Sequence, residues 1–264
     1  MNSISELVSL RGRTALITGA AGGLGSTIAK ALYGLGADLI LVDKNEMEFL
    51  DGNLKGNDTK IIYEVSELES NIEREALIRR VETQVGKLDI LINNAAFVGT
   101  SGLEGWNTRF EDQSIDTWRR AIEVNLTAPF HLCRGLLPLL RASESASIIN
   151  IGSIYGISGP DWRLYEGTKM GNPAAYAASK GGLIQFTRWL ATTLAPSIRA
   201  NCISPGGVWR AQSQEFIDRY VDRTPMRRMA VEIDFVGAAI FLATDMSKYI
   251  TGQNIAVDGG WGVW

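Results

Sequence analysis

The stretch TALITGAAGGLGSTIAKAL, residues 14–32, joins a short apolar run to a longer amphipathic pattern through a turn rich in glycine. Gly19, Gly23 and Gly25 let the chain turn sharply and let its backbone approach another group closely. The N–H groups at the start of the following helix are then free to bind an anion such as a pyrophosphate. The sequence therefore predicts a strand, a turn and a helix that together bind a nucleotide.

Short apolar runs and patterns of helical length alternate along most of the remaining chain. The expected strands are 14–18, 38–42, 60–65, 89–93, 147–151, 198–204 and 254–257, and the expected helices are 24–35, 67–85, 115–141, 174–195 and 231–243. Such alternation predicts an α/β fold of the Rossmann type, a doubly wound parallel sheet of about seven strands with helices on both faces. No linker divides the 264 residues, so we expect one domain over 1–264.

Three segments, 97–113, 154–173 and 207–229, do not fit the alternation. Each follows a strand at its carboxyl end, where open α/β sheets bind ligands, so we expect these loops to form the walls of a substrate site. Their aromatic and cationic side chains favour a polar or anionic ligand such as a sugar or sugar nucleotide, with a solvated lid as the alternative. These side chains are Trp106, Arg109, Trp162, Arg163, Tyr165, Lys169, Trp209, Arg210, Arg219 and Arg223.

The composition argues against several classes of function. A net charge of −3 gives no general attraction to nucleic acid or to anionic membranes, and the N-terminal stretch resembles neither a signal peptide nor a membrane span. Two distant cysteines, Cys133 and Cys202, suit a reducing, cytoplasmic setting. The only histidine, His131, precedes Ser153, which argues against a serine hydrolase. A zinc site would need clustered His and Cys ligands, and the sequence has no such cluster. We therefore expect no metal.

The segment YEGTKMGNPAAYAASK, residues 165–180, contains two tyrosines, each with a lysine four positions on. Tyr176 and Lys180 begin a strong helical pattern, where this spacing puts both side chains on one face. Tyr165 and Lys169 lie in a stretch whose glycines, asparagine and proline oppose a helix. An ammonium about 4 Å from a phenol is worth about 4 kcal/mol at an effective dielectric of about 20, which lowers the phenol pKa by up to about three units. We therefore predict that Tyr176 is a general acid or base.

Asp43 ends the second expected strand, 18 residues after Gly25. A carboxylate at this place accepts hydrogen bonds from both ribose hydroxyls and repels a 2′-phosphate. Ala20 and Ala21 in the glycine turn add no positive charge, although the neighbouring Lys44 could reach a phosphate. These residues favour NAD, with NADP as the alternative.

The ordered motifs resemble those of the short-chain dehydrogenase/reductase family over about residues 10–260. They are Gly-x-x-x-Gly-x-Gly at 19–25, Asn-Asn-Ala-Ala at 93–96, Asn125, Ser153, Tyr-x-x-x-Lys at 176–180 and Pro205-Gly206. The resemblance implies a hydride-transferring oxidoreductase with catalytic residues Asn125, Ser153, Tyr176 and Lys180. It also implies a cofactor-binding set of Gly19, Gly23, Leu24, Gly25, Asp43, Glu64, Val65, Asn93, Ala95, Tyr176, Lys180, Pro205, Gly206 and Val208.

The resemblance also assigns roles to single residues. Ser153 would hydrogen-bond the substrate oxygen, and Asn125 would help to hold a water near Lys180. Family members usually have about a dozen residues between this serine and the tyrosine, a spacing that fits Tyr165. We interpret the 23 positions from Ser153 to Tyr176 as an insertion in the substrate loop, because a loop length changes more easily than a helix register.

Some residues depart from the family pattern. Ala96 replaces a glycine, Glu64 stands where an aspartate often contacts the adenine, and Val208 stands near the position of a threonine.

The segment 165–183 is similar to that of family members linked to bacterial surface-sugar or flagellin-glycan pathways, and also to that of 3-oxoacyl-acyl-carrier-protein reductases. A nucleotide-binding sensor or scaffold without turnover is the alternative from another class.

The family resemblance implies a homotetramer built from the helices at 115–141 and 174–195. The tail VDGGWGVW carries two tryptophans, which we expect to pack against a neighbouring subunit or against the substrate pocket.

Overall fold

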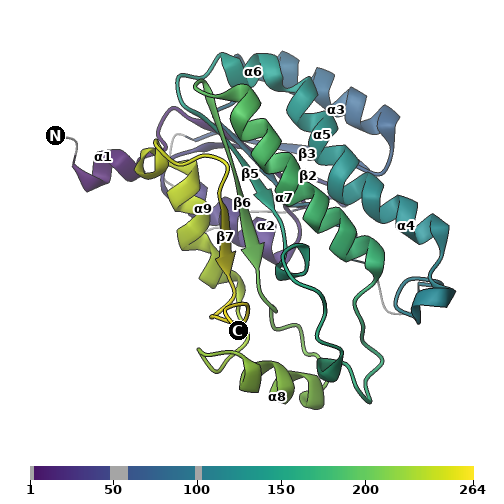
Figure 1. Cartoon of the computed structure of the whole chain (residues 1–264). Helices are drawn as coiled ribbons and strands as arrows, with labels where there is room; N and C mark the ends of the chain where they lie inside the picture. The colour runs from purple at the N-terminus through teal and green to yellow at the C-terminus, as the bar shows by residue number, and fades with distance from the viewer. Residues whose placement is uncertain (1–2, 48–58, 99–102) are drawn as a thin grey trace.

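The computed structural model describes residues 3–47, 59–98 and 103–264, and it contains a seven-stranded sheet in which every pairing is parallel (Figure 1). The strands are β1 (Thr14–Thr18), β2 (Asp38–Asp43), β3 (Ile61–Val65), β4 (Ile90–Asn93), β5 (Ala146–Ile151), β6 (Ile198–Pro205) and β7 (Asn254–Val257). Their order in the sheet is β3-β2-β1-β4-β5-β6-β7. Successive strands are therefore added on one side of β1 as far as β3, and on the other side from β4 onward, so the order of the strands reverses between β1 and β4. The predicted Rossmann-type fold is confirmed, and this reversal is where such sheets bind ligands.

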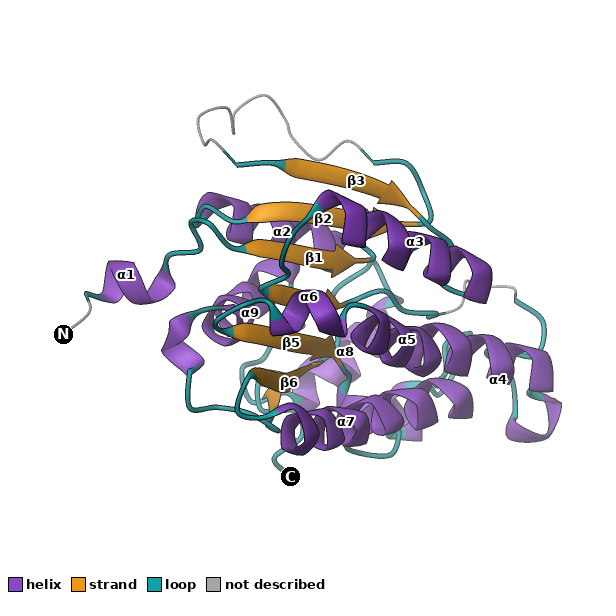
Figure 2. Cartoon of the chain, turned by 90° about the horizontal axis from the view of Figure 1, so that it is seen from above, coloured by secondary structure: helices purple, strands orange, loops and turns teal. Residues whose placement is uncertain are grey.

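Helices cover both faces of the sheet (Figure 2). On one face lie α2 (Gly23–Gly34) and α9 (Val236–Ala243), and on the other lie α3 (Asn71–Gln84), α4 (Ile115–Ile122), α5 (Ala128–Gly135), α6 (Leu137–Arg141) and α7 (Ala174–Leu194). Successive side chains of a strand point to opposite faces. Leu16 accordingly joins the core under α3, α5 and α7, whereas Ile17 joins the core under α2 and α9. The short α1 (Ile4–Val8) lies at the N-terminus.

The expected helix at 115–141 is interrupted. A π-helical segment, η3 (Glu123–Thr127), separates α4 from α5, and a break at Leu136 separates α5 from α6. Pro129 in the first turn of α5 has no N–H to donate to the carbonyl of Asn125, four residues earlier. Single-turn π segments of this kind often occur at functional sites.

The expected loop at 207–229 contains a helix, α8 (Gln214–Arg223), which is a correction to the sequence analysis. Phe216 and Tyr220, four residues apart on α8, are buried in a small apolar cluster with Leu164, Tyr165 and Trp261. The helix lies at the bottom of Figure 1, beyond the carboxyl ends of the strands. Segments 154–173 and 207–229 therefore pack together as one lobe.

Of the two tail tryptophans, Trp261 is buried in this lobe and stacks on Tyr220, at a ring-centroid distance of 6.0 Å. Trp264 is exposed, and its indole N–H donates to the carbonyl of Arg223. The expected packing of both rings is therefore found for only one of them within this chain.

Candidate active site

The turn from β1 to α2 forms a pocket of about 430 Å³ that Gly19, Gly23, Leu24, Gly25, Asp43 and Ala95 help to line. We call it the glycine pocket. Gly19 has a φ of +66°, and a Cβ added there would lie 2.8 Å from the Cα of Ala95. A Cβ at Gly25 would lie 2.2 Å from the carbonyl oxygen of Gly19. Both positions therefore require glycine, and they bring α2 close to the ends of β1 and β4.

The first turn of α2 leaves its backbone donors free to bind an anion. Gly22 caps the helix without a side-chain hydrogen bond, and the first helical bond runs from the N–H of Ser26 to the carbonyl of Gly22. The N–H groups of Gly23, Leu24 and Gly25 precede that bond at the edge of the glycine pocket. The residues present thus fit a dinucleotide, with its pyrophosphate at the start of α2.

Asp43 lies at the end of β2 and lines the same pocket. Its Oδ2 accepts from the N–H of Ala21 at 3.0 Å, and its Oδ1 accepts from the N–H of Asn45 at 3.1 Å. These bonds fix the carboxylate next to the glycine turn, where the sequence analysis expects the ribose. Lys44 also lines this pocket.

Three members of the expected cofactor set, Glu64, Val65 and Asn93, do not line the glycine pocket. The carboxylate of Glu64 accepts from Arg80 and from Gln84, each at 2.6 Å, and neither Glu64 nor Val65 lines the glycine pocket. The side chain of Asn93 is buried and donates to Asn150 Oδ1 at 2.8 Å. The side chains of Glu64 and Asn93 are thus bonded within the protein, and the place of both residues in the cofactor-binding set stays a prediction.

Asn94, which the expected cofactor-binding set omits, lines the glycine pocket. Its Nδ2 donates to the carbonyls of Thr18 and Gly19 at 2.9 and 3.0 Å. The alternation of side chains along a strand is the signal that could have distinguished it from Asn93, because Asn93 ends β4 facing the core.

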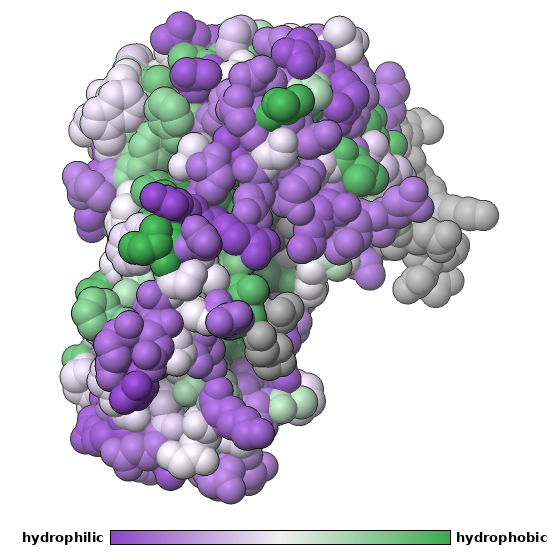
Figure 3. All heavy atoms as spheres, turned by 90° about the vertical axis from the view of Figure 1, so that its right-hand side faces the viewer, coloured by the Kyte–Doolittle hydropathy of each residue, from purple (hydrophilic) through white to green (hydrophobic). Residues whose placement is uncertain are grey.

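A second cavity, of about 600 Å³, opens beside the glycine pocket at the carboxyl ends of β4, β5 and β6. Ser153, Tyr176, Lys180, Pro205, Gly206 and Val208 are among its lining residues, and we call it the Tyr176 cleft. Leu24 and Asn94 line both cavities, so the two are adjacent. Figure 3 looks onto this edge of the molecule, where the surface is indented between the main body and the lower lobe that holds α8.

Three of the predicted catalytic side chains meet in the Tyr176 cleft. Ser153 follows the end of β5, and Tyr176 and Lys180 lie on the first turns of α7, which begins after Pro173. The Nζ of Lys180 donates to the carbonyl of Ile151 at 2.7 Å and lies 5.8 Å from the centroid of the Tyr176 ring. The i, i+4 spacing thus places the phenol and the ammonium on the same face of α7, beside the serine.

Burial dominates the electrostatics of this group. It raises the pKa of the Tyr176 phenol, and a hydrogen bond with Ser153 acts in the opposite direction. Burial also lowers the pKa of Lys180 to about 8, which Cys202 partly opposes. The net shift of the Tyr176 pKa is therefore upward, opposite to the expected lowering, because burial is its largest cause. The phenol keeps its proton at neutral pH.

The other tyrosine–lysine pair is not assembled. Gly167, with a φ of +71°, interrupts the segment between Tyr165 and Lys169. The hydroxyl of Tyr165 is hydrogen-bonded to that of Tyr155, and both rings line the Tyr176 cleft. Lys169 lines a neighbouring cavity of about 760 Å³, which we call the side pocket, and not the Tyr176 cleft.

The side chain of Asn125 is engaged within the fold. It is fully buried in η3, and its Oδ1 accepts from the N–H of Phe97 at 2.6 Å. Its Nδ2 donates to Ser179 Oγ at 3.0 Å and to the carbonyl of Phe97 at 3.2 Å. The side chain therefore fixes the loop after β4 to α7, and the expected role of Asn125 near Lys180 stays a prediction.

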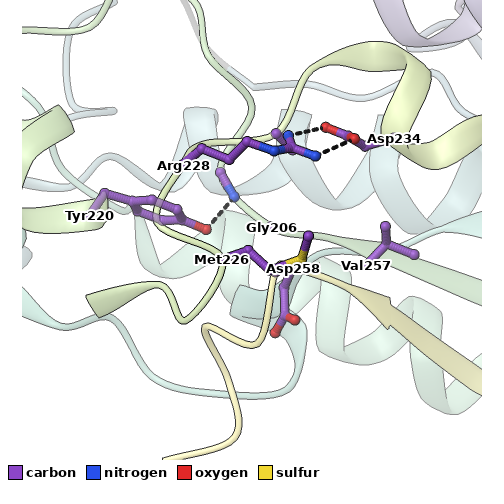
Figure 4. A pocket seen from close by; sticks show the side chains of 10 residues that line it. Gly206, Tyr220, Met226, Arg228, Asp234, Val257 and Asp258 are labelled. Carbon is purple, nitrogen blue, oxygen red and sulfur yellow. Dashed lines mark hydrogen bonds and ion pairs between the residues drawn. The ribbon is translucent and has the colours of Figure 1, made fainter. Parts of the chain in front are cut away.

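The turn after β6 packs against α8 and against the residue that follows β7. The N–H of Gly207 donates to the hydroxyl of Tyr220, and a Cβ at Gly206 would lie 2.8 Å from the Cα of Asp258. Figure 4 shows the small cavity behind this turn, of about 210 Å³, which the ion pair between Arg228 and Asp234 borders. The missed helix α8 thus supplies the residue that positions the turn.

Most of the loop cations expected around the substrate are paired. Arg163 and Arg223 bind the carboxylate of Asp161 at 2.7 and 2.6 Å. Of the ten aromatic and cationic residues singled out in the sequence, Tyr165 and Arg210 line the Tyr176 cleft. The described walls are consequently less cationic than the sequence analysis expected. The unpredicted lining residues include Asn94, Tyr155, Met170, Asn172, Gln212 and Phe216.

Comparison with known proteins agrees with this geometry. A family model described as Enoyl-(Acyl carrier protein) reductase matches residues 19–262. The chain also aligns over 99% of its length with the structure of a short chain dehydrogenase from Leptospira borgpetersenii with bound NAD+, at 33% identity and a TM-score of 0.83, covering 96% of that chain. The chain belongs to the short-chain dehydrogenase/reductase family.

Two further members of the family are informative. The 3-oxoacyl-(acyl-carrier-protein) reductase FabG of Rickettsia felis is 34% identical over 96% of this chain and 98% of its own length. A gluconate 5-dehydrogenase from Burkholderia cenocepacia, in complex with NADP and tartrate, has a TM-score of 0.86 at 28% identity and covers 99% of this chain and 100% of its own. Membership of this dehydrogenase/reductase family supports an oxidoreductase with a nicotinamide cofactor.

Two classes of site were searched for in residues 3–47, 59–98 and 103–264. Within these ranges no group of three or more His, Cys, Asp or Glu side chains is placed to hold a metal ion. No helix in the same ranges has the length and apolar character needed to cross a membrane.

Proposed function

We propose that this short-chain dehydrogenase/reductase interconverts a secondary alcohol and a ketone on a polar, hydroxylated small molecule, with Tyr176 as the general acid or base. One observation carries the proposal. Tyr176 is half-buried beside Ser153 and one helical turn from Lys180, in a cleft that is adjacent to the glycine pocket. The alternative is a non-catalytic NAD-binding sensor or scaffold.

Each side chain has a role that follows from its position. The hydroxyls of Ser153 and Tyr176 hold the substrate oxygen, and the protonated phenol donates its proton to a carbonyl oxygen. Lys180 places positive charge behind the phenol and stabilises it when it loses the proton. The nicotinamide, when bound, carries the hydride.

We propose NAD as the cofactor, with NADP as the alternative, because of the Asp43 carboxylate. Replacing Asp43 with serine removes a charge that would repel a 2′-phosphate, so the ratio of kcat/KM for NADPH to that for NADH is expected to rise by about tenfold or more. Steady-state kinetics with both cofactors measure this ratio. The matched control is Asp38→Ser, which removes the same charge at the other end of β2 and leaves the ratio unchanged. An unchanged ratio in Asp43→Ser would contradict the assignment.

The lining of the Tyr176 cleft supports a hydroxylated substrate such as a sugar, a sugar acid or a sugar nucleotide. Its described residues include Ser153, Asn172 and Gln212 together with Lys180 and Arg210, and none of them is an acid. The relative in complex with tartrate favours a hydroxy acid, whereas the FabG relative favours a 3-oxoacyl thioester as the second candidate.

A substrate panel separates these candidates. Sugar acids, sugar nucleotides, simple polyols and acyl thioesters are each mixed with the protein and either NAD+ or NADH, and the absorbance of NADH is followed. Turnover with hydroxylated substrates supports the proposal, and turnover with acyl thioesters alone supports the reductase alternative. NADH binding without any turnover would identify a sensor or scaffold.

We also propose the homotetramer that the family resemblance implies, built on α4, α5 and α7. Phe130 on α5 and Trp189 on α7 are 44% and 56% exposed, and both rings pack against Phe186. Exposed aromatic side chains that gather across two helices indicate a protein-binding face. The mass in solution, from sedimentation equilibrium, is expected to be that of four chains, and a monomeric mass would exclude the assembly.

A further inference from the structure

Asn172, in the segment just before α7, has a buried amide without a partner. The residue is 6% exposed, and neither its Nδ2 nor its Oδ1 has a hydrogen-bond partner among the described residues. It lines both the Tyr176 cleft and the side pocket, so it forms part of the wall between them. Buried polar side chains are almost always hydrogen-bonded, and an exception needs an explanation.

The amide is not needed to hold the local backbone. On one side, Asn107 Nδ2 donates to the carbonyl of Lys169 at 2.6 Å. On the other side, the N–H of Ala174 donates to Gln113 Oε1 at 3.0 Å. Residues from segment 97–113 therefore fix the chain before and after Asn172, and its own side chain contributes no hydrogen bond to that structure.

The free amide is suited to a ligand in the Tyr176 cleft. It offers one acceptor oxygen and two N–H donors, and a turn about its terminal torsion breaks no hydrogen bond. A hydroxyl group both donates and accepts, so it can satisfy this amide, whereas the carbonyl of an acyl thioester only accepts. The chemistry of the side chain thus discriminates between the two substrate classes considered above.

The charge of the cleft is compatible with an acid. Lys180 and Arg210 line it, and no carboxylate does so in the described ranges. Arg210 is partly neutralised by Glu232, with Nη1 and Oε1 2.7 Å apart, while Lys180 is bonded to a neutral carbonyl. A ligand that carries both hydroxyl and carboxylate groups therefore meets complementary partners.

We propose that Asn172 hydrogen-bonds a substrate hydroxyl other than the reacting one, and that it thereby selects hydroxylated acids and polyols over acyl thioesters. The proposal rests on the proposed function and specifies its substrate class. Asn172 and Tyr176 line the same cleft, so a hydroxyl of a substrate held there is the group that Asn172 would bind.

The test compares tartrate with succinate, which have the same charge and carbon skeleton and differ by two hydroxyl groups. Isothermal titration calorimetry in the presence of NAD+ measures both affinities for the wild type and for Asn172→Leu. The wild type is expected to bind tartrate roughly tenfold or more tightly than succinate, and the variant is expected to bind them equally. A tartrate preference that persists in Asn172→Leu, or that is absent from the wild type, would overturn the proposal.

Two further measurements separate ligand binding from a structural role. Asn172→Leu is expected to unfold at the same temperature as the wild type or higher, because an apolar side chain replaces an unpaired buried amide. A lower unfolding temperature would indicate a structural role and count against the proposal. Lys169→Met alters the side pocket only and is expected to keep the tartrate preference.

The outcome is independent of turnover. Tartrate binding is read by calorimetry, whereas the proposed oxidoreductase function is read by NADH absorbance. A lost tartrate preference in Asn172→Leu supports the Asn172 subsite even if the reaction class were wrong. If the protein turns over a hydroxylated substrate but Asn172→Leu keeps the tartrate preference, only the proposed Asn172 subsite is contradicted.

Discussion

Replacing Tyr176 with phenylalanine is expected to lower kcat by about a thousandfold or more, while NADH still binds. The change removes one hydroxyl from a half-buried side chain beside Ser153 and leaves the ring in place. Loss of the proton donor affects the transition state and not the binding of the dinucleotide, which the glycine pocket provides. Initial rates of NADH oxidation with a substrate from the panel, together with NADH fluorescence titration, measure both quantities.

Tyr165→Phe is the matched control, because Tyr165 lines the same cleft and belongs to the other tyrosine–lysine pair. Its hydroxyl is hydrogen-bonded to Tyr155 and is not paired with a lysine, so kcat is expected to fall by less than about tenfold. A larger loss in Tyr165→Phe than in Tyr176→Phe would mean that the wrong tyrosine has been assigned.

Lys180→Met is expected to lower kcat by at least about a hundredfold, because the phenol loses the charge that stabilises its ionised form. Lys169→Met, at the equivalent place in the other pair, is expected to retain activity because Lys169 does not line the cleft. Equal losses in the two variants would contradict the assignment of the pair.

Lys180→Met is also expected to change how the free energy of unfolding depends on pH. The folded-state pKa of Lys180 is about 8, below the value of 10.5 expected for a free lysine. Between these values the unfolded chain binds the extra proton, so the free energy of unfolding of the wild type increases as the pH rises through this window. Relative to Lys180→Met, the wild type is expected to gain up to about 3 kcal/mol from about pH 7 to about pH 10. Urea unfolding at a series of pH values measures the difference, and a constant difference would show that folding does not lower the pKa of Lys180.

The strands could be predicted because of where they lie. A parallel strand covered on both faces is a continuous apolar run, as in TALIT of β1. Such a run can be identified in the sequence without knowing which strands pair with it. Helix α8 was missed because its charged residues resemble a solvated loop. Its signal was the pair Phe216 and Tyr220 at helical spacing, which are buried only because segment 154–173 packs against them.

Side-chain direction explains why the site was predicted only in part. Tyr176 and Lys180 follow from a helix register, and Gly19 and Gly25 follow from a turn that admits no Cβ, so local sequence was sufficient for them. Glu64 is different, because its partners are Arg80 and Gln84 on α3 and no local pattern reveals them.

The structural roles of two other residues depend on segments far away in the sequence. The side chain of Asn125 bonds the backbone of Phe97, 28 residues away. The amide of Asn172 can be identified as unpaired only from the structure, because the surrounding polar groups bond to other residues. Such roles follow from the packing of separate segments and not from spacing along the chain.

A crystal structure with NAD+ and a hydroxylated acid tests the central claim most directly. We expect the pyrophosphate at the start of α2, the ribose hydroxyls at Asp43, and the nicotinamide ring beside the hydroxyls of Tyr176 and Ser153. A nicotinamide ring that lies next to Tyr165 and away from Tyr176, or a dinucleotide bound outside the glycine pocket, would contradict it.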